Sequence, residues 1–279
     1  MKYIRRSPAP KRIPFSREIF PILSLLLFII SISARAESDK VSSGLRELLL
    51  SSRFKAGQKE RFSVSISGDR GLLNKDYSPA STFKTYLALA LLEQAGDKTK
   101  ERVECSDKHV PSSPRGLDLR DALFYSSNEY FEKIFPELGK EKLHSVLQKI
   151  GYLPKSEFSV SDWWTDMDGL KHGGRIRKTP EEIHGFWAGI FQDGFGLSDR
   201  LVSDWKEVLV WSDCPDKKAV VYGKTGSWES SFWFQGSLYS KDSKDYVIYT
   251  ILQRGEKASR TGTIRRFYEL VGCEMPSLD

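Results

Sequence analysis

The sequence predicts an α+β domain, in which an antiparallel sheet is flanked by helices and carries a helical insertion. Two observations favour this fold class. Strand patterns lie toward both ends, because residues 61–67 alternate polar and apolar side chains and residues 219–253 are rich in β-branched and aromatic ones. The region between them has helical patterns. Strand-rich ends around a helical middle predict one domain rather than two independent ones.

The expected elements begin with the half-buried strand over residues 61–67. Gly68 and Gly71 indicate a turn before a second short strand near Leu72. The next segment, residues 82–94, is apolar and lacks helix breakers, so we expect a helix buried on most sides.

The middle of the chain is expected to be helical with loops. Apolar side chains recur at helical spacing around residues 119–134 and again over 140–150. Another helix begins at Thr179 and Pro180, where proline suits the first turn. Residues 198–205 have a less regular helical pattern.

The C-terminal part changes character. Three strands are expected over residues 219–224, 231–239 and 245–253, with a polar turn at 241–244. A final helix over residues 263–271 completes the domain.

The N-terminus has the features of an export signal. Basic residues precede an apolar run at 19–33, and Ala34-Arg35-Ala36 follows as a small-x-small cleavage site. The run is shorter than the roughly 20 residues that a membrane-spanning helix needs. We therefore expect residues 1–36 to be a cleaved signal peptide, and residues 37–279 to form a domain exported to the periplasm or cell envelope without a stable membrane span. An uncleaved anchor is the alternative.

Composition argues against two classes of partner. The net charge of +6 lies in the leader, so the remaining domain is near neutral, and no basic cluster is interleaved with aromatics. We expect no nucleic-acid partner. The four histidines and three cysteines lack the spacing of metal ligands, so we also expect no metal. One pair among Cys105, Cys214 and Cys273 could form a disulfide, and the pairing stays open.

The first of three short motifs is Ser81-Thr82-Phe83-Lys84. Ser81 and Lys84 stand one helical turn apart, so the lysine can remove the proton of the serine hydroxyl. Taken alone, the motif is better explained by Ser81 as a helix N-cap with a solvated Lys84, because serine is frequent at that position. The same spacing at Ser52 and Lys55 is interpreted as chance, because that serine does not open a buried helix.

Two further motifs follow. Ser126-Ser127-Asn128 interrupts a helical pattern with side chains that compete for backbone hydrogen bonds, which marks a turn or a site. Lys224-Thr225-Gly226 continues a strand pattern, where the lysine and threonine can bind a carboxylate and the glycine permits close approach to the backbone. A solvated kink and a surface strand are the simple structural alternatives.

Together, in this order, the motifs resemble those of the penicillin-recognising serine family, which comprises penicillin-binding proteins and serine β-lactamases. Residues 78–84 are similar to class D β-lactamases and related sensor domains, whereas residues 118–128 are more similar to penicillin-binding transpeptidases. The resemblance, closest to class D, implies an acyl-enzyme that binds penicillin and hydrolyses β-lactams. Two alternatives remain: a D-Ala-D-Ala peptidase of peptidoglycan metabolism, and a β-lactam-binding module without turnover.

The resemblance also implies catalytic roles. Ser81 would be the acylated nucleophile and Lys84 its base. Ser126 would relay a proton to the leaving nitrogen, and Asn128 would contact the substrate amide.

The remaining roles concern substrate binding. Lys224 and Thr225 would hold the substrate carboxylate with help from Arg260, and Gly226 would let the substrate approach. Backbone N–H groups of Ser81 and Ser227 would form the oxyanion hole.

One position departs from the class D pattern. Class D enzymes usually have an apolar residue where this chain has Asn128, and the resulting dry pocket permits carbamylation of the lysine by carbon dioxide. Asn128 would make the pocket wetter, which argues against a carbamate on Lys84; no other cofactor is expected. Acidic residues that could replace the carbamate as deacylating base are Glu157, Asp162, Asp166 and Asp168.

Overall fold

The computed structural model describes residues 44–58, 60–95, 99–110, 116–153 and 176–278. The chain separates into two units, Met1–Ser42 and Ser43–Asp279, and all described residues belong to the second. The expected signal peptide therefore lies outside the described residues. Within these ranges, no helix is both long and apolar enough to cross a membrane.

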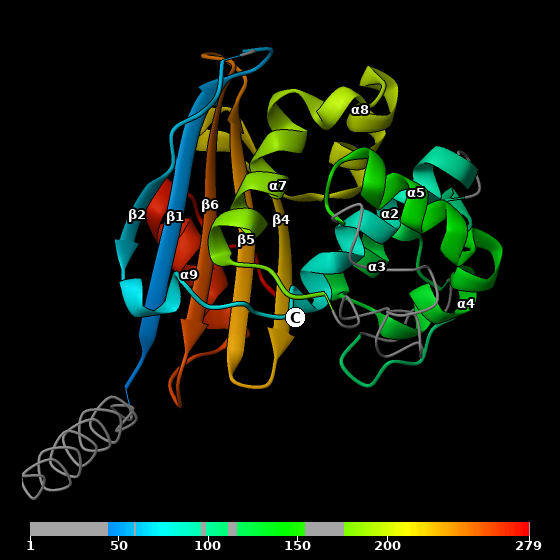
Figure 1. Ribbon diagram of the computed structural model, residues 1–279, viewed down its shortest axis with the longest axis horizontal. Helices are drawn as coiled ribbons and strands as arrows, with labels where there is room; N and C mark the ends of the chain where they lie inside the picture. The colour runs from blue at the N-terminus through cyan, green and yellow to red at the C-terminus, as the bar shows by residue number, and fades with distance from the viewer. Residues whose placement is uncertain (1–43, 59, 96–98, 111–115, 154–175, 279) are drawn as a thin grey trace, which may run out of the picture. The chain divides into compact units, whose positions relative to one another are not determined.

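A six-stranded antiparallel sheet forms the centre of the domain (Figure 1). Its strand order is β2-β1-β6-β5-β4-β3. The strands are β1 (Arg46–Lys55), β2 (Ser65–Gly68), β3 (Val210–Cys214), β4 (Ala219–Trp228), β5 (Ser231–Ser240) and β6 (Asp245–Arg254). The predicted fold class is confirmed, since this sheet is flanked by helices and a helical region stands between β2 and β3.

Helices cover both faces of the sheet (Figure 1). Successive side chains of β6 point to opposite faces of the sheet. Thr250 is hydrogen-bonded to His184 of α7, whereas Ile251 packs in the apolar cluster that includes residues of α9. The helices are α2 (Lys84–Ala95), α3 (Leu119–Tyr125), α4 (Asn128–Leu138), α5 (Lys140–Lys149), α7 (Pro180–Gln192), α8 (Asp199–Val208) and α9 (Arg260–Val271).

A buried indole fixes the start of α2 against α8. Trp205 of α8 is fully buried and donates a hydrogen bond from Nε1 to the carbonyl oxygen of Thr85, at 2.8 Å. Because Thr85 directly follows Lys84, this bond holds the first turn of α2 in place. The helix that carries the first motif is therefore anchored from outside the site.

Most expected elements are present, and two need correction. Residues 61–64 are not in a strand, so β2 is limited to Ser65–Gly68. The expected short strand near Leu72 is wrong, because Arg70–Leu72 is a 3₁₀ turn. Asp69 caps this turn by accepting a hydrogen bond from the Gly71 N–H, and such a capped turn satisfies backbone groups locally without a neighbouring strand.

One disulfide joins two segments that are distant in sequence. Cys214, at the end of β3, is bonded to Cys273, just after α9, across a separation of 59 residues. Cys105 is half-buried and free. The bridge closes the loop that contains β4, β5, β6 and α9.

A buried histidine links α7 to the sheet. The ring of His184 is 2.7 Å from Ser52 Oγ through Nε2 and 3.0 Å from Thr250 Oγ1 through Nδ1. His184 has no exposed surface, and burial lowers its pKa to about 4. The imidazole is therefore neutral at pH 7, and each of its two nitrogens is hydrogen-bonded to a hydroxyl group.

This histidine should make the protein sensitive to mild acid. The folded state holds the His184 pKa below its ordinary value, so the unfolded state binds the proton more readily. The stabilising contribution is complete above about pH 6.5 and falls as the pH approaches 4, by about 2 kcal/mol at pH 5. Urea unfolding of wild type and His184→Asn at pH 7.5 and 5.0 measures it. The prediction would be contradicted if the free energy of unfolding of His184→Asn fell as much between pH 7.5 and 5.0 as that of wild type.

Candidate active site

The segment before α2 holds Ser81 against strand β4. Ala80–Phe83 is a 3₁₀ turn, and Ala80 has a left-handed φ of 49°. The Ser78 hydroxyl accepts a hydrogen bond from the Ala80 N–H at 3.1 Å, which satisfies that strained position. Ser81 is half-buried, whereas its neighbours on both sides are buried. The turn therefore presents the Ser81 side chain at the edge of the buried interior.

Gly226 is what allows this segment to lie so close to β4. A Cβ atom at Gly226 would stand 2.9 Å from Thr82 Cγ2 and 3.0 Å from the Pro79 carbonyl oxygen. Any larger residue would push the 3₁₀ turn away from the strand. The glycine of the third motif thus positions the first motif directly, a function that its place in the sequence did not predict.

Lys84 lies fully buried among groups of the first two motifs. Its Nζ is 3.1 Å from Ser81 Oγ, which confirms that the spacing of the first motif brings the two together. It also donates to the carbonyl oxygen of Ser126 at 3.0 Å and to Asn128 Oδ1 at 2.6 Å, and Ser126 Oγ lies at 3.5 Å. An amine at this distance can take a proton from the serine hydroxyl.

The second motif forms the connection between α3 and α4. Ser126 ends α3 in a left-handed conformation with φ of 62°, and α4 begins at Asn128. Asp107 caps α4: it accepts hydrogen bonds from the Asn128 N–H at 2.8 Å and from Ser127 Oγ at 2.5 Å. The sharp turn thereby directs the side chains of Ser126 and Asn128 toward Lys84.

Lys224 completes the cluster from β4. Its fully buried Nζ donates to Ser126 Oγ at 2.9 Å and to the Thr225 carbonyl oxygen at 2.9 Å. The Ser126 hydroxyl therefore lies between two amines, at 2.9 Å from Lys224 and 3.5 Å from Lys84. This arrangement suits a hydroxyl that passes protons.

Three cationic side chains gather at this end of β4. Arg260, the first residue of α9, donates from Nε to Thr225 Oγ1 at 3.2 Å and from Nη2 to the Phe124 carbonyl oxygen at 3.3 Å. Burial, followed by the charges of Lys84 and Arg260, lowers the pKa of Lys224 well below its ordinary value. Burial also lowers the pKa of Arg260. The region thus attracts an anion.

Hydrogen bonds and close packing bring together all but one of the expected site residues: Ser81, Lys84, Ser126, Asn128, Lys224, Thr225, Gly226 and Arg260. Ser227 is exposed and lies next to Gly226 on β4, opposite Phe232 of β5. The four acidic candidates for a deacylating base lie outside the described residues. Among the described residues, no three His, Cys, Asp or Glu side chains are placed to hold a metal ion.

Sequence reasoning missed two residues of the site. Asp107 holds the second motif as described above, and His109 Nε2 lies 3.3 Å from the Ser126 carbonyl oxygen, the same atom that accepts from Lys84. Both belong to a loop without regular periodicity. Their spacing to the motifs, about 20 residues, carries no signal, because loop length does not fix where a loop folds back.

Sequence comparison identifies relatives of this chain. The sequence model of the penicillin binding protein transpeptidase domain matches residues 48–222. Regulatory protein BlaR1 of Staphylococcus aureus is 26% identical over 198 residues, 68% of this chain and 32% of that protein. β-Lactamase OXA-10 of Pseudomonas aeruginosa is 25% identical over 164 residues, 57% of this chain and 58% of that protein. The chain thus spans about a third of the regulatory relative.

Solved structures share the fold. The class D β-lactamase FUS-1 (OXA-85) from Fusobacterium nucleatum subsp. polymorphum aligns with a TM-score of 0.60, 17% identity and coverage of 88% of this chain and 97% of that one. The class D β-lactamase YbXI from Nostoc aligns with a TM-score of 0.62 and 17% identity over 83% of this chain and 96% of that one. This likeness establishes the fold alone. With the family match covering more than half of its length, the chain belongs to the penicillin binding protein transpeptidase domain family.

Proposed function

We propose that this protein is an exported serine acyl-enzyme that is acylated at Ser81 by penicillin-like β-lactams. The observation that supports the proposal best is the 3.1 Å contact between Lys84 Nζ and Ser81 Oγ in a buried cluster. In the acylation step, Ser81 Oγ forms a bond to the lactam carbonyl carbon while its proton passes to Lys84 Nζ. The bond from that carbon to the lactam nitrogen breaks.

The rest of the cluster supports the departure of the nitrogen. Ser126 Oγ gives its proton to the leaving nitrogen and is resupplied by Lys84 or Lys224, which lie 3.5 Å and 2.9 Å away. The substrate carboxylate binds near Lys224, Thr225 and Arg260, where it relieves the mutual repulsion of the cations. Backbone N–H groups of Ser81 and Ser227 stabilise the oxyanion.

Incubation with a fluorescent penicillin tests the proposal. We expect the mature protein to acquire label in a 1:1 covalent complex, and peptide mass spectrometry to place the label on Ser81. Absence of both label and hydrolysed product would overturn the proposal. Loss of label with time, accompanied by product, identifies a β-lactamase; retained label identifies a penicillin-binding peptidase or a binding module without turnover.

A specific contact favours a second candidate function, in which the protein is acylated and the acyl-enzyme is not hydrolysed. Asn128 Oδ1 accepts a 2.6 Å hydrogen bond from Lys84 Nζ, and this contact occupies the amine in its unmodified form. A carbamate at Nζ would remove the ammonium donor and place a negative charge beside an oxygen acceptor. Without a carbamate, and with no acidic residue in its place as deacylating base, hydrolysis of the acyl-enzyme would be slow.

Replacement of Asn128 tests this idea. We expect Asn128→Leu to shorten the lifetime of the acyl-enzyme by about tenfold in bicarbonate, because the amine loses an acceptor worth roughly 1.5 kcal/mol and lies in a drier pocket. Time-resolved release of label measures the lifetime with and without bicarbonate.

Asn128→Asp is the matched control, since it keeps an oxygen acceptor and stabilises the ammonium form. An Asn128→Leu protein that holds its label as long as wild type would contradict the inference, provided that wild type itself is labelled.

A further inference from the structure

A loop that precedes α3 in the sequence is fastened to the start of α4. We call residues 104–109 the capping loop. The Glu129 carboxylate accepts hydrogen bonds from the Ser106 N–H at 2.5 Å and from its hydroxyl at 2.8 Å. Lys133 pairs with Glu129 at 2.7 Å and donates to the Glu104 carbonyl oxygen at 2.6 Å. These contacts hold the capping loop on the first turns of α4.

Asp107, in the middle of the capping loop, meets three donors where α4 begins. Its carboxylate accepts from the Ser127 hydroxyl at 2.5 Å, from the Asn128 N–H at 2.8 Å and from the Glu129 N–H at 3.2 Å. The first N–H groups of a helix have no acceptor within the helix itself. Ser127 supplies one more acceptor, since its Oγ receives the Tyr130 N–H at 3.1 Å. Together the two side chains fix the start of α4 in one arrangement.

Ser126 depends on this support because its backbone is strained. Its φ of 62° lies in the left-handed region, which is unfavourable for a residue with a Cβ atom and persists only where the surroundings enforce it. This conformation places Ser126 Oγ between Lys224 and Lys84. The capping loop also reaches the Ser126 carbonyl oxygen, through His109 Nε2 at 3.3 Å. Release of the loop would let Ser126 relax and withdraw its hydroxyl from the two amines.

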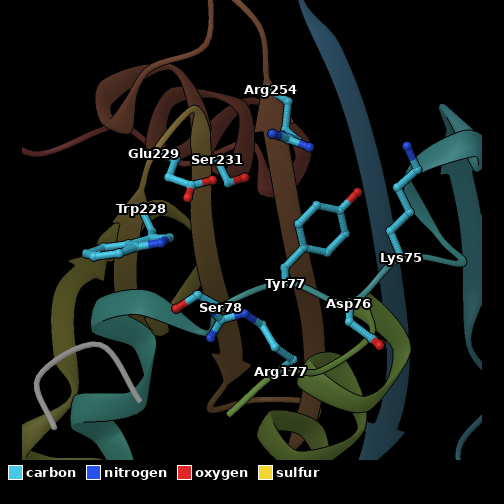
Figure 2. Close-up of a pocket in the computed structure, with 9 residues that line it drawn as sticks. All are labelled: Lys75, Asp76, Tyr77, Ser78, Arg177, Trp228, Glu229, Ser231 and Arg254. Carbon is cyan, nitrogen blue, oxygen red and sulfur yellow. The ribbon is translucent and has the colours of Figure 1, made fainter. Parts of the chain in front are cut away.

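The nucleophile is held by other contacts. Ser81 follows a segment that packs against β4 at Gly226. Figure 2 shows Tyr77 and Ser78 of that segment beside Trp228 at the end of β4, and these three residues line one cavity. Loss of the capping loop should therefore displace the hydroxyl that passes protons and leave the nucleophile in place.

We propose that Asp107 is a positioning residue for acylation. Its bonds to Ser127 and Asn128 keep the Ser126 hydroxyl between its two amines. The inference rests on the proposed function for the reaction that Asp107 serves. It predicts that a change at Asp107 slows the chemical step and leaves substrate binding nearly intact, because the residues expected to bind the substrate carboxylate belong to β4 and α9.

Stopped-flow acylation by a fluorescent penicillin separates the maximal rate from the half-saturating concentration. We expect Asp107→Ala to lower the maximal rate about tenfold and to change the half-saturating concentration less than about threefold, because a displaced relay group costs rate rather than binding. Asp107→Asn keeps an acceptor oxygen for the Asn128 N–H and should recover most of the rate.

Two further variants complete the comparison. Ser127→Ala removes the hydroxyl that links α4 to Asp107 and should lower the maximal rate about threefold, so it decides the matter if Asp107→Ala does not fold. Asp193→Ala is the matched control, since Asp193 also caps a turn, by accepting from the Phe195 N–H at 3.0 Å, and contributes nothing to the catalytic cluster. It should react as wild type. An unchanged maximal rate in both Asp107→Ala and Ser127→Ala, or an equal loss in Asp193→Ala, would overturn the inference.

A second measurement is independent of acylation. The chain has two asparagines, Asn74 and Asn128, so selective ¹⁵N-asparagine labelling isolates their side-chain amide signals in an NMR spectrum. We expect the Asn128 signal to shift in Asp107→Ala, because its Oδ1 leaves the ammonium of Lys84, while the Asn74 signal stays as the internal reference. An unshifted Asn128 signal would also overturn the inference. If wild type does not react with penicillin, a shifted Asn128 signal refutes the proposed function alone and leaves the positioning of the second motif by Asp107 standing.

Discussion

Ser81→Ala is expected to abolish covalent labelling by a fluorescent penicillin, with acylation reduced by at least about 10³-fold. The nucleophilic oxygen is removed, and the Ser126 hydroxyl keeps its place between the amines of Lys84 and Lys224, where its expected role is proton transfer. Gel fluorescence and intact-protein mass spectrometry measure the loss. The thermal midpoint of unfolding should stay close to that of wild type, since Ser81 is half-buried and alanine fits the same turn.

Ser52→Ala is the informative control, because Ser52 and Lys55 repeat the motif spacing. Ser52 lies in β1, where residues three apart point to opposite faces of the sheet, and Lys55 is exposed whereas Ser52 is buried. We expect this variant to keep full labelling and to lose only stability, through the His184 contact. Labelling that survives in Ser81→Ala and disappears in Ser52→Ala would refute the assignment of the nucleophile.

Removal of the disulfide is expected to lower the free energy of unfolding by roughly 3 to 4 kcal/mol. The double variant Cys214→Ser/Cys273→Ser removes a cross-link between residues that are 59 positions apart in the sequence. The unfolded chain therefore regains the conformational freedom that the cross-link restricts. Urea unfolding followed by tryptophan fluorescence measures the change, because several tryptophans are fully buried.

Cys105→Ser provides the comparison, since this cysteine is half-buried and free. The Cys105→Ser substitution should lower the free energy of unfolding by less than about 1 kcal/mol. If the double variant were no less stable than Cys105→Ser, the bridge would not contribute in the way proposed.

The helices and the C-terminal strands were predictable because their patterns are local. α7 begins at a Thr179 cap with Pro180 in the first turn, and Glu182 completes a capping box. β4, β5 and β6 combine β-branched and aromatic residues with short turns. These signals depend on neighbours within a few residues, which a sequence displays directly.

The first strand was missed for a physical reason. β1 alternates buried and exposed positions, but the buried position between Leu50 and Phe54 is Ser52, a polar residue. Its hydroxyl is satisfied by His184, which lies 132 residues away in the sequence. A strand whose inward face contains a polar residue looks irregular until the partner of that residue is known.

The motifs predicted which groups meet, but not how they meet. The bond from Lys84 to Asn128 depends on the left-handed turn at Ser126, and that turn depends on Asp107 from another loop. Gly226 was expected to admit substrate, and its observed contact is with Pro79 and Thr82 of the nucleophile segment. Both arrangements follow from tertiary packing, which short motifs do not encode.

The gathering of Lys84, Lys224 and Arg260 has a consequence for the folded state itself. Water solvates these groups in the unfolded chain, whereas burial disfavours the charged forms of Lys224 and Arg260 in the folded domain, and the charges of Lys84 and Arg260 add to this effect at Lys224. The empty domain is therefore less stable than its packing alone would make it. By linkage, an anion that enters the site stabilises the whole fold as it binds, so substrate recognition and resistance to unfolding increase together.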